Sequence, residues 1–133
     1  MSMRKFQQNK LWRDKMVAHV EQMGSVVHCH RLDDAAYDQQ LRLKLLEEAD
    51  EVARATNQKE LIAELGDVLE AIDALCVLHG LAKEDVLAVQ AAKRVERGGF
   101  YDRLFVTIAE HPAGSYLEQY CLAEPEKYPE VLR

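Results

Sequence analysis

Two stretches of sequence decide the fold of this chain: AAYDQQLRLKLLEEADEVARA at residues 35–55 and LIAELGDVLEAIDALC at residues 61–76. In the first, apolar side chains recur every three or four residues, which places them on one face of an α-helix. These side chains are Leu41, Leu45, Ala49 and Val52. The second stretch repeats the pattern, and Asn57 and Glu60 before it resemble a capping box. The sequence therefore predicts two consecutive helices that can pack as an antiparallel hairpin.

Both predicted helices carry a pair of acidic residues at the same spacing. Glu48 and Glu51 are three residues apart in the first helix, as are Glu64 and Asp67 in the second. On a helix this spacing places both members of a pair within roughly 60° of each other, beside the apolar stripe. If the stripes pack together, four carboxylates converge, and a divalent cation would relieve their repulsion. Oxygen ligands without nearby Cys or His favour Mg²⁺ or Mn²⁺ over zinc.

The rest of the chain adds two further predicted helices, over residues 11–23 and 83–97, each ending at glycine. Residues 26–32 and 103–108 are rich in strand-forming side chains, and we expect them to form short strands that pair. The expected fold is mainly α. It is a helical bundle of four to five helices, with one small two-stranded β pairing and a core completed by oligomerisation.

Composition narrows the class of protein. The 17 basic and 23 acidic residues give a formal charge of −6, which argues against a nucleic acid polymer as the main partner. No apolar run reaches the roughly 18 residues of a membrane span, and the first residues lack the apolar core of a signal peptide. The three cysteines, Cys29, Cys76 and Cys121, are scattered and odd in number. Together these features predict a soluble protein of the reducing cytoplasm.

Three blocks of the chain resemble a known family. The segments EEADE at 47–51 and ELGD at 64–67 resemble the E-x-x-E…E-x-x-D signature of MazG-like all-α nucleoside triphosphate pyrophosphohydrolases. The segments NKLWRDK at 9–15 and KRVERGGF at 93–100 are similar to the corresponding blocks of a short, single-domain house-cleaning branch of that family. The resemblance implies a helical catalytic domain over residues 1–110. Residues 111–133 match no pattern of the family, and we expect them to form a tail that packs on the body or on a neighbouring subunit.

The resemblance also implies a reaction and a set of metal ligands. Members of the family hydrolyse nucleoside triphosphates, here expected to be non-standard ones, to the monophosphate and pyrophosphate. Carried over by motif, Glu48, Glu51, Glu64 and Asp67 would bind Mg²⁺, with Mn²⁺ as a substitute, so that an acidic site can hold a polyanion. A carboxylate not fully committed to metal would activate the attacking water. Glu47 and Glu51 are the candidates, and the sequence does not choose between them.

Two basic groups are candidates for binding the phosphates of the substrate. Lys10, Arg13 and Lys15 form the first group, and Lys93 and Arg97 belong to the second. Basic residues in the last turn of a helix also complement its dipole, so the second group has an alternative explanation. The resemblance further implies a homodimer or homotetramer.

Two other functions are compatible with the same residues. The acidic faces could be solvated surfaces of a non-catalytic helical adaptor, because glutamate beside an apolar stripe is usually exposed. The carboxylate pattern is also shared by phosphoribosyl-ATP pyrophosphohydrolases, although the blocks at 9–15 and 93–100 favour the house-cleaning branch.

Overall fold

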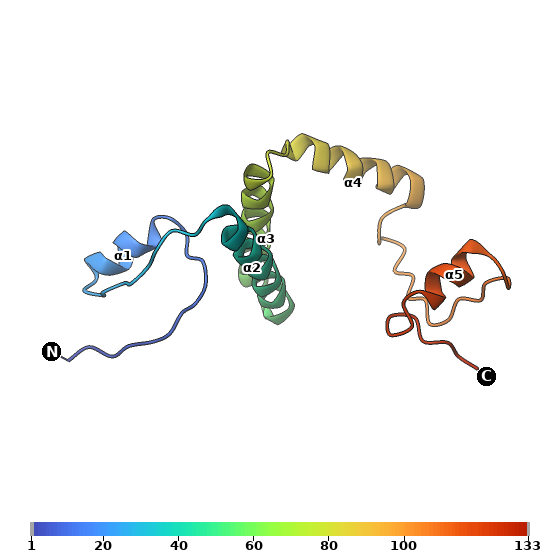
Figure 1. Ribbon diagram of the computed structural model, residues 1–133, viewed down its shortest axis with the longest axis horizontal. Coiled ribbons are helices and arrows are strands. Elements are labelled where there is room, and N and C mark those ends of the chain that lie inside the picture. Colours follow the sequence, from blue (N-terminus) through green and yellow to red (C-terminus); the bar gives the residue numbers. More distant parts are fainter. Residues whose placement is uncertain (1, 133) are drawn as a thin grey trace. The chain divides into compact units, whose positions relative to one another are not determined.

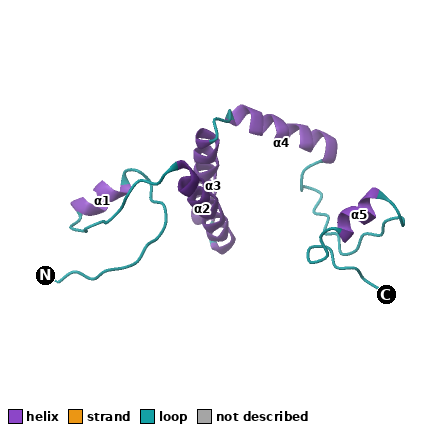
Figure 2. Cartoon of the chain, in the orientation of Figure 1, coloured by secondary structure: helices purple, strands orange, loops and turns teal. Residues whose placement is uncertain are grey.

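The computed structural model describes residues 2–132, in which every regular element is an α-helix (Figures 1 and 2). The elements are α1 (Met16–Gln22), α2 (Asp34–Arg54), α3 (Gln58–Leu78), α4 (Lys83–Arg97) and α5 (Tyr116–Leu122). The expected mainly α fold is confirmed. No helix among residues 2–132 combines the length and the apolar character needed to cross a membrane.

Helices α2 and α3 form the predicted hairpin and lie side by side (Figure 1). The side chain of Asp33 caps α2 by accepting a hydrogen bond from the backbone N–H of Ala36 at 2.9 Å. Asn57 caps α3 in the same way, accepting from the N–H of Glu60 at 2.9 Å. The Glu60 carboxylate accepts in return from the N–H of Thr56 at 3.0 Å. These contacts fix where one helix ends and the next begins. The predicted cap at Asn57 is confirmed, but Glu60 accepts from the N–H of Thr56, one residue before the N–H that a capping box uses.

The interior of the hairpin is small. Among the described residues, the buried apolar side chains are Leu41, Ala71 and Cys76, and the buried charged side chain is Glu48. Several larger apolar side chains on the same two helices stay exposed. They include Leu43, Leu46, Ile62, Leu65 and Leu69. One chain therefore leaves much of the apolar surface of this hairpin in contact with water.

Two expectations for the remaining elements are wrong. Residues 26–32 and 103–108 contain no strand, and their side chains stay accessible: Val26 is 65% exposed and Phe105 is 89% exposed. A single two-stranded pairing has little stability without a face to bury, so local β-propensity does not suffice here. The first helix begins at Met16 and not near residue 11, because residues 10–13 run along the hairpin and make ion pairs with it.

The chain divides into two compact units, Met1–Lys93 and Arg94–Arg133. The first contains α1, α2, α3 and most of α4, and the Nζ of Lys83 at the start of α4 lies 2.9 Å from the Oδ1 of Asp73 on α3. In the second, the ring of Tyr120 lies 6.3 Å from that of Tyr116 and 5.8 Å from that of Tyr128. The domain boundary expected at residue 110 stays a prediction.

Loss of the α3 cap should destabilise the hairpin. We expect Asn57→Ala to lower the free energy of unfolding by about 1 kcal/mol, because the N–H of Glu60 loses its acceptor. Urea denaturation followed by circular dichroism measures this change. Lys59→Ala, in the first turn of α3, is the matched control and should be close to neutral. Equal stability of Asn57→Ala and wild type would show that this cap contributes nothing.

Candidate metal centre

Three carboxylates from the two long helices meet beside the core of the hairpin. One carboxylate oxygen from each of Glu48 on α2 and Glu64 and Asp67 on α3 lies within 4.8 Å of the other two. Glu48 lies six residues before the end of α2, and Glu64 lies six residues after the start of α3, so the short turn brings them to the same level. Glu48 is buried, and the other two are half-buried.

Electrostatics in this group penalise the negative charge. Desolvation, reinforced by the charges of Asp67, Glu51 and Glu48, raises the pKa of Glu64 above its ordinary value. A divalent cation among the three oxygens would remove this penalty. A donor set made only of carboxylate oxygens fits Mg²⁺ or Mn²⁺. The structure thus brings together three of the four ligands predicted from the sequence.

Glu51, the fourth predicted ligand, lies outside the group of three. It is on the same helix as Glu48 but is exposed. Its negative charge still acts on Glu64, as the raised pKa of that residue shows. The side chain of Glu51 therefore lies near the acidic group but is not one of the three carboxylates that meet there.

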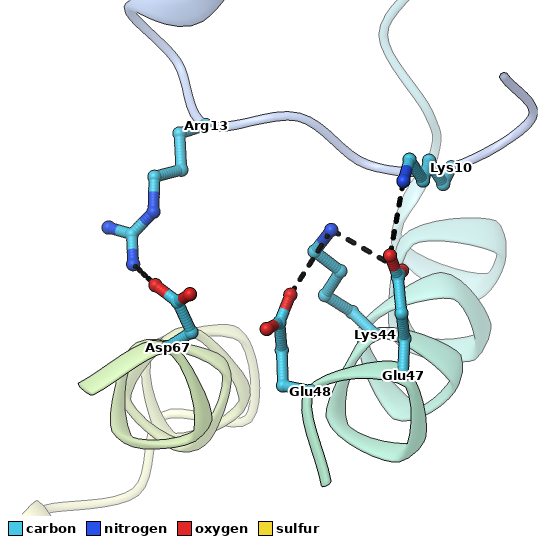
Figure 3. Close-up of polar contacts among 6 residues, drawn as sticks. All are labelled: Lys10, Arg13, Lys44, Glu47, Glu48 and Asp67. Carbon is cyan, nitrogen blue, oxygen red and sulfur yellow. Dashed lines mark hydrogen bonds and ion pairs between the residues drawn. The ribbon is translucent and has the colours of Figure 1, made fainter. Parts of the chain in front are cut away.

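Two cations of the N-terminal segment contact the acidic helices (Figure 3). The Nη2 of Arg13 donates to the Oδ1 of Asp67 at 2.6 Å, and this hydrogen bond raises the pKa of Arg13 above its ordinary value. The Nζ of Lys10 donates to the Oε1 of Glu47 at 3.2 Å. The contacts join residues 37 and 54 positions apart in sequence. The basic block at residues 10–15 is thus part of the same site as the acidic motifs.

Sequence reasoning missed one cation of the site, Lys44. Its Nζ lies 3.4 Å from the Oε2 of Glu47 and 3.4 Å from the Oε1 of Glu48, so the ammonium bridges two adjacent carboxylates (Figure 3). The signal was present in the sequence, because a lysine three and four residues before two glutamates lies on their face of a helix. Burial alone would raise the pKa of Glu47, but its hydrogen bond to Lys10 and the charge of Lys44 lower it below its ordinary value.

Comparison with known proteins assigns this part of the chain to a family. Residues 37–98 match the family model described as the MazG nucleotide pyrophosphohydrolase domain. This segment is similar to MazG domains. Neither the curated proteins nor the solved structures contain a significant match to the chain. The MazG match confirms the resemblance identified from the acidic motifs and supports nucleotide pyrophosphohydrolase activity.

The acidic group of the matched segment borders a cleft of about 910 Å³. One wall is the segment around residues 8–16, and the others come from α2 and α3. The charged side chains on its lining include Lys10, Arg13, Lys15, Lys44, Glu48 and Asp67. The cleft therefore combines carboxylates that can hold a metal with cations that can hold phosphate.

The remaining predicted substrate-binding residues have no ion pair with the acidic group among the described residues. Lys15 lines the cleft. Lys93 and Arg97 are exposed on α4, in its last turns, where they also complement the helix dipole. Lys93 is inside the matched MazG segment, as is Arg97, whereas the basic block at residues 10–15 precedes it. The role of Lys93 and Arg97 in substrate binding stays a prediction.

The repulsion in the acidic group should be visible in the stability of the metal-free protein. The pKa of Glu64 is higher in the folded chain than its ordinary value of 4.5, so stability is lost as the pH rises through 4.5 to the folded value. We therefore expect Glu64→Gln to raise the melting temperature in chelator at pH 7, with a smaller rise at pH 4.

Glu84→Gln on α4 removes the same charge from an exposed position and is the control for this measurement. Differential scanning calorimetry of both variants at the two pH values gives the comparison. A lower melting temperature for Glu64→Gln at pH 7 would contradict the expected repulsion.

Proposed function

We propose that this protein is a Mg²⁺-dependent nucleoside triphosphate pyrophosphohydrolase that removes non-standard nucleotides from the cytoplasmic pool. The products are the nucleoside monophosphate and pyrophosphate. The observation that carries the proposal is the meeting of three carboxylates of the MazG domain with three paired cations at one cleft. A solvated acidic surface, as an adaptor would have, does not require that one glutamate of the group be buried.

Glu48, Glu64 and Asp67 would hold the metal, with Glu51 as a further ligand or a partner of bound water. When bound, Mg²⁺ polarises the phosphoryl oxygens and neutralises the charge of the leaving pyrophosphate. The burial of Glu48 supports a ligand role, because a buried carboxylate needs a cation partner. Mn²⁺ would be a functional substitute.

Of the two candidates for activating water, we favour Glu51. Glu47 is held by Lys10 and Lys44, and its lowered pKa makes it a weaker base. Glu51 is exposed beside the acidic group and is free of the ion pairs that hold Glu47. We assign Glu47 the role of positioning the two lysines.

The cations of the cleft would bind the phosphate chain. Arg13 offers a planar guanidinium, which suits bidentate contact with phosphate oxygens, and Lys10 and Lys15 offer point charges on the same segment. The current partner of Arg13 is Asp67, a carboxylate that the metal would neutralise, whereas Lys10 pairs with Glu47 beside the metal ligands. From the sequence motif alone, we also propose Lys93 and Arg97 as substrate-binding residues.

Release of pyrophosphate from a panel of standard and damaged nucleoside triphosphates tests the activity. We expect pyrophosphate in the presence of Mg²⁺ or Mn²⁺ and none in chelator. Glu48→Gln should lower kcat by about 100-fold or more, because a ligand is lost from the metal. The variant should remain folded, since the amide fills the same volume.

Glu84→Gln is the control for this substitution, being the same chemical change on an exposed turn of α4. Phosphoribosyl-ATP belongs in the panel, and its preferential hydrolysis would replace the house-cleaning assignment with the related pyrophosphohydrolase. Folded wild-type protein that releases no pyrophosphate from any member would favour the adaptor.

We also propose that the active form is a homodimer or homotetramer. The support is the apolar surface that one chain leaves exposed on the hairpin. Ile62, Leu65 and Leu69 are spaced to share one face of α3, and they are 65%, 46% and 53% exposed. A patch of this kind is typical of an interface.

A charge on this face should therefore disrupt the assembly. We expect Leu69→Glu to shift the protein from oligomer to monomer in size-exclusion chromatography with light scattering at micromolar concentration. Val26→Glu places the same charge at another exposed position and should leave the mass unchanged. A monomeric wild-type protein would contradict the proposal directly.

A further inference from the structure

Lys44 is the least exposed of the three cations that pair with the acidic helices at the cleft. Its side chain is 22% exposed, against 44% for Lys10 and 56% for Arg13. It projects from the middle of α2, whereas the other two cations are on the N-terminal segment. Helix α2 thus presents this ammonium beside Glu48, on the lining of the cleft (Figure 3).

We propose that Lys44 is a further substrate-binding residue, whose ammonium holds the phosphate chain of the nucleotide and of the released pyrophosphate. This inference rests on the proposed function, since it assigns one more residue to the same cleft. Neither the matched family description nor the sequence motifs single out this lysine.

The chemistry of the pairs explains how one ammonium serves both carboxylate and phosphate. At 3.4 Å from both Glu47 and Glu48, Lys44 makes two long contacts and no short one. A metal bound by Glu48 would neutralise that carboxylate and weaken its attraction for Lys44. The partly desolvated ammonium would then take phosphate oxygens as its new acceptors, and these form strong charge-assisted hydrogen bonds.

The same arrangement predicts effects of opposite sign on two ligands. When the charge of Lys44 is removed, the acidic group attracts a divalent cation more strongly, because a competing positive charge near Glu48 has gone. When the ammonium of Lys44 is removed, the cleft binds pyrophosphate less strongly. A residue that only maintains the shape of the site would weaken both ligands when replaced, so the two signs separate binding from structure.

The experiment measures both affinities for Lys44→Gln. Binding of Mn²⁺ alone is followed by the electron paramagnetic resonance signal of the free ion, and binding of inorganic pyrophosphate with Mg²⁺ by titration calorimetry. We expect Mn²⁺ to bind about threefold more tightly and pyrophosphate about tenfold more weakly. The KM for the nucleotide should rise in parallel with the loss of pyrophosphate binding.

Two further variants control the measurement. Lys44→Arg keeps the charge and should bind pyrophosphate within about threefold of wild type. Lys44→Arg also serves if Lys44→Gln fails to fold. It should retain both affinities, although the geometry of the contact changes. Lys59→Gln removes the same charge from an exposed position of α3 outside the cleft lining, and neither affinity should change.

Unchanged pyrophosphate binding in Lys44→Gln, with an active wild type, would overturn this inference and leave the proposed function intact. Weaker binding of both ligands would also overturn it, in favour of a structural role. A wild-type protein that neither hydrolyses nucleotides nor binds pyrophosphate would overturn the proposed function and this inference together.

Discussion

The crowding of negative charge between α2 and α3 is the constraint on which the site depends. A helix hairpin usually places carboxylates in solvent, but here Glu48 is buried and has Glu64 and Asp67 as close neighbours. Such a group is unfavourable by itself, because desolvation and repulsion act in the same direction. The structure compensates for it with cations: Lys44 lies beside Glu48, and Arg13 donates to Asp67.

The path of the N-terminal segment follows from this charge. Leu11 and Trp12 fit the helical spacing of the apolar residues that follow, yet this segment runs along the hairpin, and the helix begins only at Met16. The ion pairs of Lys10 and Arg13 hold this segment beside the acidic helices. The cleft, whose wall this segment forms, is thus a product of electrostatics as much as of apolar packing.

Sequence reasoning was most successful where local rules decide the structure. The two long helices, the cap at Asn57 and the acidic pairs all depend on short-range spacing, and the structure follows them. It failed where tertiary context decides. The β-branched segment at 26–32 finds no partner strand, and the start of the first helix is displaced by contacts with residues more than 30 positions away. The position of Lys44 is a local feature too, because a lysine three and four residues before Glu47 and Glu48 lies on their face of the helix.

The length of the short turn between α2 and α3 sets the positions of the carboxylates of α3 relative to Glu48 on α2. Only residues 55–57 separate the two helices, and the α3 end of the turn is fixed by the Asn57 cap and by the hydrogen bond that Thr56 donates to Glu60. One inserted residue that extended α3 at its start would rotate the rest of that helix by about 100° and shift it by about 1.5 Å. Asp67 and Glu64 would then turn away from Glu48 while every residue of the motifs stayed in place. The length of this turn is therefore as much a part of the site as the carboxylates themselves.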